Sequence, residues 1–438
     1  MARTHPIHSA EHALERLGSL PGGPELLAAA KQREDIALVG GAVRDLLLGH
    51  WPRELDVTVD GDAAGLATSL AASVSPSERA YGHAVRPTIH DRFGTASVAW
   101  AYGRIDVAER RAESYPAPGA LPEVRHGSFE EDLARRDFTV NAIALALAGP
   151  ERGQLHNVDD ALEDLAAGRL RVLHEQSFID DPTRVLRLAR YSARLGFEIE
   201  PHTLELARAA VAGGALDTVS GGRVGAELWL AVREADGVAA LSALDGLGVL
   251  AALGLPSPFD AALARAALDL LPSEGRPDLL LMASAFPHGR HDADAVAALS
   301  DLMERLEFTR EQLRPVLEVV SRAASIVEGV TAAPSDAIAY MLMDGRSLEC
   351  VALGAAISAR GSGTAAQRVR AWLASERNVK LAIDGNDLIA AGIAEGPEVG
   401  LRLGAALLAK REGTAPDRDA QLRAALGAEL VEGQSIET

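Results

Sequence analysis

The amino-acid sequence predicts an α+β protein of several domains, in which an α/β part is followed by helices. Three observations support this fold class. The stretch from Ile36 to Asp60 alternates strand, turn, helix and strand patterns. From about residue 240 onward the sequence is a series of Ala- and Leu-rich segments that favour helices. The 438 residues also exceed one ordinary core, so about two to four domains are expected, with residues 1–35 as a helical lead-in.

The first strand is expected at Ile36–Val39, an apolar and partly β-branched run. Gly40 and Gly41 follow where the chain must turn tightly, and there the bare backbone N–H groups can come close to a ligand. Arg44 lies one helical turn further on and can reach the same anion as the helix N-terminus. Gly49 is expected to close this short helix. The stretch therefore predicts a phosphate site formed by Gly40, Gly41 and Arg44.

The second strand carries acidic residues on one face. Every second residue from Leu55 to Val59 is apolar and should face the core, whereas Glu54 and Asp56 share the opposite face. Two carboxylates at this spacing beside a phosphate site make a plausible Mg²⁺ site.

A helix at 64–72 and a strand pair at 95–100 and 104–108 are expected next. In the last of these strands Asp106 faces away from the core, so it could join Glu54 and Asp56 as a third carboxylate. A solvated strand acid would give the same pattern.

Residues 109–128 hold three prolines and two glycines, so we expect a loop rather than a helix or a strand. Ser128 is then expected to cap a helix that continues through residues 132–147. This helix would carry cationic and amide groups within about one turn of one another, at Arg135, Arg136, Asp137 and Asn141. From the residue types alone, an exposed ion-pair face is the favoured interpretation.

A further helix is expected from Asp181, which suits the N-cap position, with Pro182 at the first helical position. Its apolar stripe lies opposite a row of arginines, which a solvated face would explain equally well. The arginines are Arg184, Arg187, Arg190 and Arg194.

Charge and composition restrict the function. A formal net charge of −19 argues against a basic nucleic-acid-binding domain, but residues 166–234 contain equal numbers of arginines and acids, so a restricted arginine surface could still bind nucleic acid. The single cysteine, Cys350, excludes an internal disulfide. No apolar run approaches the ~18 residues of a membrane span, and the N-terminal sequence lacks a signal-like apolar region, so we expect a cytoplasmic protein.

At these residues the chain resembles the bacterial class II tRNA nucleotidyltransferase and poly(A) polymerase family of the nucleotidyltransferase superfamily. The family signature GG-x-VRD-x-LLG is matched by residues 40–49, and the following D-x-D reads Glu54-Leu55-Asp56, with Glu54 where the family has aspartate. Residues 135–142 match RRDFT-x-NA. Residues 180–190 match (E/D)DPxRxLRxxR, with Asp180 where Glu is common.

The resemblance implies a head domain with a mixed sheet at 1–155, then an all-helical neck at 156–240, body at 241–380 and tRNA-binding tail at 381–438. The implied activity is template-independent addition of CMP and AMP, from CTP and ATP, to the 3′ end of tRNA, with Mg²⁺ as cofactor and Mn²⁺ as an alternative. The predicted catalytic residues are Glu54, Asp56 and Asp106, with Glu54 and Asp56 holding the metal. Gly40, Gly41 and Arg44 are predicted to bind the triphosphate, and Asp181, Arg184, Arg187 and Arg190 the base. The resemblance implies that Arg136 and Asp137 hold ribose and triphosphate, and Asn141 is predicted beside them.

Other functions stay open at this stage. An enzyme of the same family could add CC only, A only or poly(A), and Glu54 together with the acidic surface could mark a non-catalytic RNA-binding relative. A metal-dependent phosphohydrolase motif at His288, His291 and Asp292 is disfavoured, because these residues lie in a polar turn without an acidic partner at a recognisable spacing. The oligomeric state does not follow from the sequence.

Overall fold

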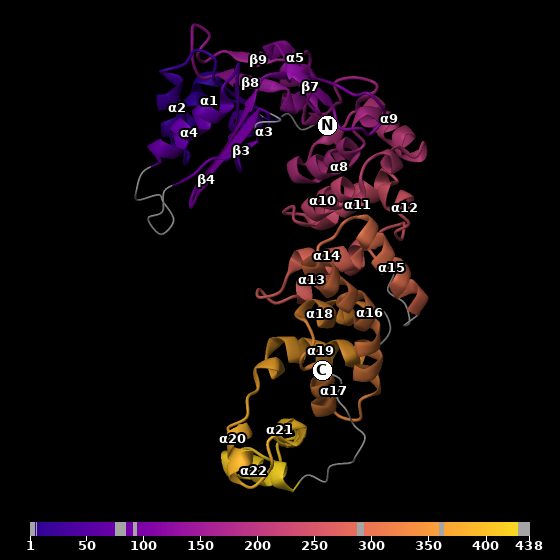
Figure 1. The fold of residues 1–438 in the computed structure, drawn as a ribbon. Coiled ribbons are helices and arrows are strands. Elements are labelled where there is room, and N and C mark those ends of the chain that lie inside the picture. The colour runs from indigo at the N-terminus through magenta and orange to yellow at the C-terminus, as the bar shows by residue number, and fades with distance from the viewer. Residues whose placement is uncertain are drawn as a thin grey trace. The chain divides into compact units, whose positions relative to one another are not determined.

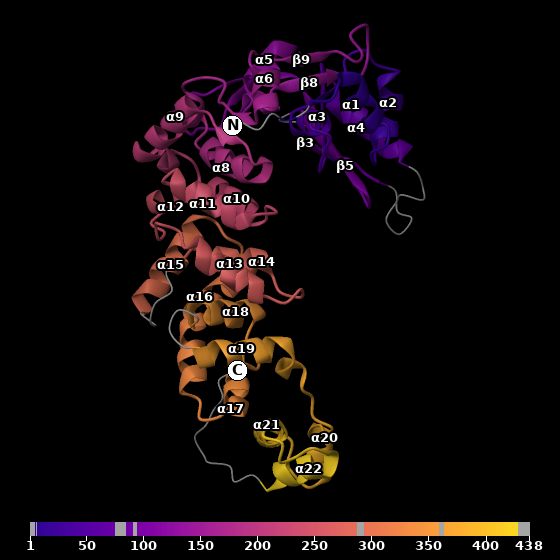
Figure 2. The ribbon, with the colours of Figure 1, turned by 180° about the vertical axis from the view of Figure 1, so that it is seen from behind.

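The structure is a computed structural model, and it describes residues 5, 7–74, 85–90, 94–286, 293–358 and 363–427. The residues considered above as a phosphohydrolase motif, His288, His291 and Asp292, lie outside this part. The chain forms two compact units, Met1–Ala235 with Ala243–Leu253, and Asp236–Ser242 with Gly254–Thr438. Figure 1 and Figure 2 show the ribbon from opposite sides.

The first unit is built on a seven-stranded sheet with the order β3-β4-β5-β2-β1-β8-β9. Strands β2 and β5 run parallel and all other neighbours run antiparallel, so the sheet is mixed, as predicted. The strands are β1 (Ala37–Val39), β2 (Leu55–Val59), β3 (Thr88–His90), β4 (Thr95–Trp100), β5 (Gly103–Glu109), β8 (Ile143–Ala146) and β9 (Leu155–Asn157).

Helices α1, α2 and α4 gather beside this sheet (Figure 1). The short helix α3 follows the Gly40-Gly41 turn and ends before Gly49, which has φ 75° as a closing residue requires. The helices of this part are α1 (Ala10–Leu17), α2 (Gly23–Ala30), α3 (Gly41–Leu47), α4 (Ala63–Ser73), α5 (Phe129–Ala134) and α6 (Ala161–Ala167). The predicted lead-in helices, the turn and the strand pair are confirmed.

The prediction of a loop over residues 109–128 was wrong. Strands β6 (Arg111–Ser114) and β7 (Glu123–His126) pair antiparallel as a separate two-stranded sheet. The prolines and Gly119 lie in the connection between the two strands, where the missing N–H groups of proline leave the ladder intact.

The prediction that the helix begun at Ser128 continues through residue 147 was also wrong. Ser128 does cap α5 in a capping box with Glu131, but α5 ends at Ala134, and a short 3₁₀ turn (Thr139–Asn141) leads into β8. Strand β8 is wholly buried and pairs with β1 on one side and β9 on the other. These two ladders outweigh the helical propensity of its alanine and leucine residues.

The rest of the first unit is mainly helical, and α8 packs against α10. Its elements are β10 (Arg169–Leu170), α7 (Ser177–Asp180), α8 (Thr183–Leu195), β11 (Glu198–Ile199), α9 (Pro201–Ala212), a 3₁₀ turn (Ala215–Thr218), α10 (Gly221–Val232) and α12 (Val249–Ala252), while α11 (Gly237–Gly246) runs through both units.

The described part of the second unit is helical, as predicted. Helix α18 is buried along most of its length among α13, α16 and α19, and Arg411 on α21 bonds Asp344 after α17 at 2.6 Å. None of the described helices is both long and apolar enough to cross a membrane. The helices are α13 (Ala261–Leu270), α14 (Pro277–Ser284), α15 (Ala293–Arg305), α16 (Arg310–Ala332), α17 (Asp336–Met343), α18 (Leu348–Ser358), α19 (Gly363–Ala374), a 3₁₀ turn (Glu376–Asn378), α20 (Gly385–Ala390), α21 (Pro397–Arg411) and α22 (Arg418–Leu426). The finer division into head, neck, body and tail stays a prediction.

Candidate active site

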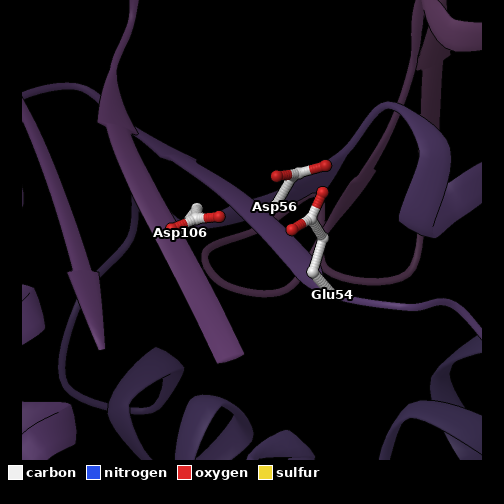
Figure 3. A group of neighbouring side chains, drawn as sticks. All are labelled: Glu54, Asp56 and Asp106. Atoms are coloured by element: carbon white, nitrogen blue, oxygen red, sulfur yellow. The ribbon is translucent and has the colours of Figure 1, made fainter. Parts of the chain in front are cut away.

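Three carboxylates from two neighbouring strands gather at one place on the sheet. Glu54 lies directly before β2, Asp56 is the second residue of β2, and Asp106 lies on β5. Because β2 and β5 run parallel with Asp56 opposite Asp106, the two side chains share one face. Carboxylate oxygens of all three residues lie within 4.8 Å of one another (Figure 3). Asp106 is therefore a neighbour of the predicted pair, as the strand pattern suggested.

The negative charge on Asp56 is poorly compensated. Burial and the neighbouring Glu54 carboxylate raise the pKa of Asp56 to about 7, Asp106 adds to this, and Arg136 and Arg104 oppose it. Arg104 is itself paired with Asp106, at 2.9 Å. A set of carboxylate oxygens alone is the donor set that hard divalent cations prefer, and such a cation would relieve the repulsion. The residues present therefore fit a divalent metal ion.

Metal binding to this group should weaken as the pH falls through about 7. The raised pKa means that Asp56 is protonated below this value in the folded protein, and a proton competes with a cation for the carboxylate. The dissociation constant for Mn²⁺, measured by electron paramagnetic resonance, should rise by up to about tenfold for each pH unit below 7. A dissociation constant that does not change between about pH 5.5 and pH 8 would contradict a role for Asp56 as ligand.

The Gly40-Gly41 turn joins β1 to α3 and meets an arginine from another segment. Gly40 has φ 68°, and a Cβ atom at this position would lie 2.9 Å from Nη1 of Arg136. Glycine is thus required for the turn and for the close approach of the guanidinium group. The N–H groups in the first turn of α3 have no partner within the helix, so together with Arg136 they offer a group of donors to an anion, called the anion cradle below. Its use as a phosphate site stays a prediction.

Arg44 lies beneath this turn and is 1% exposed. Its Nε and Nη2 donate to Oδ1 of Asp45 at 2.8 and 2.7 Å, and its Nη1 donates to Oδ1 of Asn141. The side chain borders the cleft described below, but its hydrogen bonds hold α3 to the segment before β8. Its predicted contact with a triphosphate stays a prediction.

The segment after α5 connects the anion cradle to α8. Asp137 accepts a hydrogen bond from Nδ2 of Asn141 at 2.9 Å and forms an ion pair with Nη2 of Arg187 at 2.7 Å. Burial alone would raise the pKa of Asp137, but Arg187 and the bond from Asn141 hold it below its usual value. The side chains of Asp137 and Asn141 are thus fixed in place. Their predicted roles at the ribose stay predictions.

The arginine face of α8 lies against other parts of the unit rather than in solvent. Arg184 bonds neutral oxygens, at 2.8 Å from the Arg135 carbonyl and 3.2 Å from Oγ of Ser177. The other three arginines have carboxylate partners: Arg187 pairs with Asp137, Arg190 with Glu227 and Glu234, and Arg194 with Asp45.

Asp181 makes its recorded bonds through one carboxylate oxygen. Oδ1 accepts from the backbone N of Thr183 at 3.1 Å, from Oγ1 of Thr183 at 2.6 Å and from Nη2 of Arg223 at 2.8 Å. Helix α8 begins at Thr183 with Pro182 at the capping position, so it starts one residue later than predicted. The bond from the backbone N of Thr183 still lets Asp181 cap the first turn of the helix. Oδ2 has no hydrogen-bond partner within the described part of the chain, so it can accept from water or from a ligand.

One cleft of about 730 Å³ brings these groups together, a volume typical of small-molecule sites. Asp106 lies in an adjoining cavity that shares Asp56 and Arg136 with the cleft. The predicted site residues that line the cleft are Gly40, Gly41, Arg44, Glu54, Asp56, Arg136, Asp137, Asn141, Asp181, Arg184, Arg187 and Arg190.

Four residues of this region were not among the predicted site residues. Two of them, Glu113 and Tyr115, lie on or beside β6, in a passage that matches the R-x-E-x-Y pattern of the family the chain resembles. Both line the cleft, and Tyr115 donates to Glu113 at 3.1 Å. Glu227 and Glu234 bond Arg190. Glu227 lies on α10 and Glu234 two residues after its end. Their spacing of seven residues, about two helical turns, is the signal in the sequence that relates the two carboxylates to one side of this segment.

Comparison with known proteins identifies the family. Residues 36–171 match the model of the Poly A polymerase head domain. The CC-adding tRNA nucleotidyltransferase of Deinococcus radiodurans is 34% identical, and the match covers 78% of this chain and 84% of that protein. The chain belongs to the tRNA nucleotidyltransferase family.

Other family members differ in length and in the nucleotide they are named for. The A-adding tRNA nucleotidyltransferase of Geobacter sulfurreducens is 35% identical over 89% of this chain but only 44% of its own length. That of Halalkalibacterium halodurans is 41% identical over 51% of each protein. The chain thus spans about half, or less, of these relatives. Among solved structures, a CCA-adding enzyme complexed with CTP is 25% identical with a TM-score of 0.75, covering 96% of this chain and 99% of that chain.

Proposed function

We propose that the chain adds CMP and AMP, from CTP and ATP, to the 3′ end of tRNA without a nucleic-acid template. The observation that carries this proposal is the single cleft bordered by Glu54 and Asp56, by the Gly40-Gly41 cradle and by the N-terminal part of α8. Nucleotidyl transfer needs a metal site, a phosphate site and a base site side by side, and the cleft offers a candidate for each. Because tRNA and both triphosphates are cytoplasmic, we propose this compartment for the reaction.

Each group of residues around the cleft would have its own role in the transfer. A divalent cation, for which we propose Mg²⁺, would be held by Glu54, Asp56 and Asp106 and would lower the pKa of the primer 3′-hydroxyl and neutralise charge at the α-phosphate. The first-turn N–H groups of α3 and the Arg136 guanidinium would hold the leaving pyrophosphate. Asp181 and Arg184 would face the base, and the pairing of Asp137 with Arg187 would keep α8 beside the phosphate site.

Incorporation of single nucleotides tests the proposal. The protein would be given tRNAs that end before the CCA sequence, after its first C or after CC, with CTP and ATP added separately. We expect CMP to be added to the first two primers and AMP to the third. No transfer with either Mg²⁺ or Mn²⁺ would contradict the proposal and would favour a non-catalytic RNA-binding relative.

A second candidate function is addition of A only. It is favoured by the relatives from Geobacter sulfurreducens and Halalkalibacterium halodurans, which are named as A-adding enzymes. In the same assay an A-adding enzyme would extend only the primer that ends in CC. A CC-adding enzyme, the function of the Deinococcus radiodurans relative, would extend the other two and stop.

Glu54→Asp should keep the activity or raise it. Glutamate places its oxygens roughly 1 Å further from the backbone than the aspartate that the family signature has at this position, and Mg²⁺ demands strict octahedral geometry. The ratio of kcat with Mn²⁺ to kcat with Mg²⁺ should therefore fall in this variant, since the shorter side chain suits the stricter ion. A loss of more than about tenfold with both ions would mean that the rest of the site is built for the longer side chain.

A further inference from the structure

Glu234 is a buried carboxylate shared by two arginines that come from distant parts of the chain. It lies two residues after the end of α10, and its side chain is 1% exposed. Oε2 accepts from Nη2 of Arg53 at 3.0 Å, and Oε1 accepts from Nε of Arg190 at 3.2 Å. A buried charge is costly unless it is paired and hydrogen-bonded, and here each oxygen has its own cationic donor.

The contact between Arg53 and Glu234 lies next to the candidate metal-binding carboxylates, Glu54, Asp56 and Asp106. It directly precedes Glu54 in the turn between α3 and β2, and its side chain is 57% exposed. Because β2 begins at Leu55, the strand ladder does not hold Glu54 itself, and its position depends on the turn. The turn is also held at its start, where Arg16 lies 4.8 Å from the ring centre of Trp51.

The second arginine bound to Glu234, Arg190, belongs to the row of arginines on α8. It also pairs with Glu227 of α10, so α8, α10 and the turn meet at the two guanidinium groups bound to Glu234. Asp181 and Arg184, proposed above to face the base, lie at the beginning of the same α8. A shift of the turn relative to α8 would therefore change the distance between the metal-binding carboxylates and the base site.

We propose that Glu234 is a positioning residue for nucleotidyl transfer, which fixes the turn bearing Glu54 through Arg53 and fixes that turn against α8 through Arg190. The inference rests on the proposed function for its effect on transfer, but its effect on metal binding does not depend on the substrate. Glu234 touches neither the reacting atoms nor the metal group, so it acts only through its two arginines.

The proposal predicts a specific loss in Glu234→Gln. The neutral amide keeps the shape of the side chain but can accept through only one of its two terminal atoms, so residue 234 loses its bond to Arg53 or to Arg190. We expect the dissociation constant for Mn²⁺, measured directly by electron paramagnetic resonance, to rise by about tenfold or more, the size seen when residues behind metal ligands are changed. On primers that the parent extends, kcat should fall by a similar factor, while KM for the nucleotide changes by less than about threefold.

Arg53 supplies the second variant, because its exposed side chain can be changed with little risk to folding. Arg53→Met should show the same two losses as Glu234→Gln, and Arg53→Lys should recover part of them. The double variant Arg53→Met/Glu234→Gln should be no worse than either single one, since both break the same contact. Glu227→Gln is the matched control, because it removes a carboxylate from Arg190 and leaves Arg53 paired with Glu234; it should bind Mn²⁺ as the parent does.

The outcomes separate this inference from the proposed function. If the parent transfers no nucleotide, the proposed function fails, while Mn²⁺ binding still tests the role of Glu234. If Arg53→Met binds Mn²⁺ as tightly as the parent, or if the two substitutions multiply in the double variant, the positioning role is wrong. Equal loss in Glu227→Gln would also overturn it, because general support of α8 by α10 would then explain the result.

Discussion

Asp56→Asn should lose nucleotidyl transfer by at least about 10³-fold and yet resist heat better than the parent at pH 8 without divalent metal. The loss follows from the position of Asp56 between Glu54 and Asp106, where the amide cannot replace a charged metal ligand. The gain in resistance to heat follows from the burial of residue 56, because asparagine has nearly the shape of aspartate but carries no charge to bury.

The stability effect should depend on pH in a defined direction. The pKa of Asp56 is raised from 3.8 to about 7 in the folded protein, so the folded state disfavours the charged form. This cost is absent below pH 4, where the carboxyl is protonated in both states, grows between pH 4 and 7, and is complete above pH 7. With allowance for screening by solvent, it is on the order of 1–3 kcal/mol, which corresponds to about 2–8 °C in Tm.

Thermal unfolding of parent and variant at about pH 5, 6, 7 and 8 measures this directly. The difference in Tm should be largest at pH 8 and shrink toward pH 5. Mn²⁺ should raise the Tm of the parent more than that of the variant, because the variant keeps only two of the three carboxylates. A variant that keeps full Mg²⁺-dependent transfer would show that the active site lies elsewhere.

The part of the site that could be predicted from sequence is the part that lies on single elements. The run from β1 through the Gly40-Gly41 turn to β2 combines a strand pattern, a special backbone conformation and an alternating strand, and each of these leaves a local signal. The row of arginines on α8 has helical spacing for the same reason. To predict that Asp106 belongs to the site, one must also assume that β5 pairs with β2. The alternation of residues along β5 places Asp106 on the face away from the core, and this was enough to suggest that it lies beside Glu54 and Asp56.

The remaining features depend on contacts between residues far apart in the chain. Arg44 bonds Asn141 across a separation of 97 residues, and Arg53 bonds Glu234 across 181. A sequence window of about 10 to 20 residues contains only one member of each pair, so its hydrophobic periodicity gives no sign of the contact. Residues 132–147 illustrate the limit for the fold itself. Their alanines and leucines favour a helix locally, but β8 takes the place between β1 and β9 and is buried there.

The largest effect on specificity is expected at Asp181 and Arg184. Asp181 can only accept hydrogen bonds and Arg184 can only donate them, so together they can present a mixed edge to a base. The structure favours this use, because both side chains line the cleft and each has capacity left. The recorded bonds of Asp181 go to Oδ1, and the three recorded bonds of Arg184 use three of its five N–H groups.

Cytosine and adenine each offer an amino donor beside a ring-nitrogen acceptor, whereas uracil and guanine present the reverse polarity at these positions. A wrong base would leave a buried polar group unpaired, at a cost of about 1–3 kcal/mol, or roughly 5- to 150-fold in kcat/KM. Asp181→Ala and Arg184→Ala should therefore lose discrimination against UTP and GTP by about this factor, at least as much as they lose rate.

Asp181→Asn separates base recognition from helix capping. Asparagine caps a helix as well as aspartate does, so the bond to the backbone N of Thr183 and the stability of the protein should be kept. One acceptor oxygen becomes a donor NH₂ group, however, so the polarity of the edge changes. We expect this variant to unfold at nearly the temperature of the parent and to show a changed preference among the four nucleoside triphosphates in single-nucleotide incorporation. If Asp181→Asn and Arg184→Ala both keep the preference of the parent, Asp181 acts only as the cap of α8 and the base is selected by other residues of the cleft.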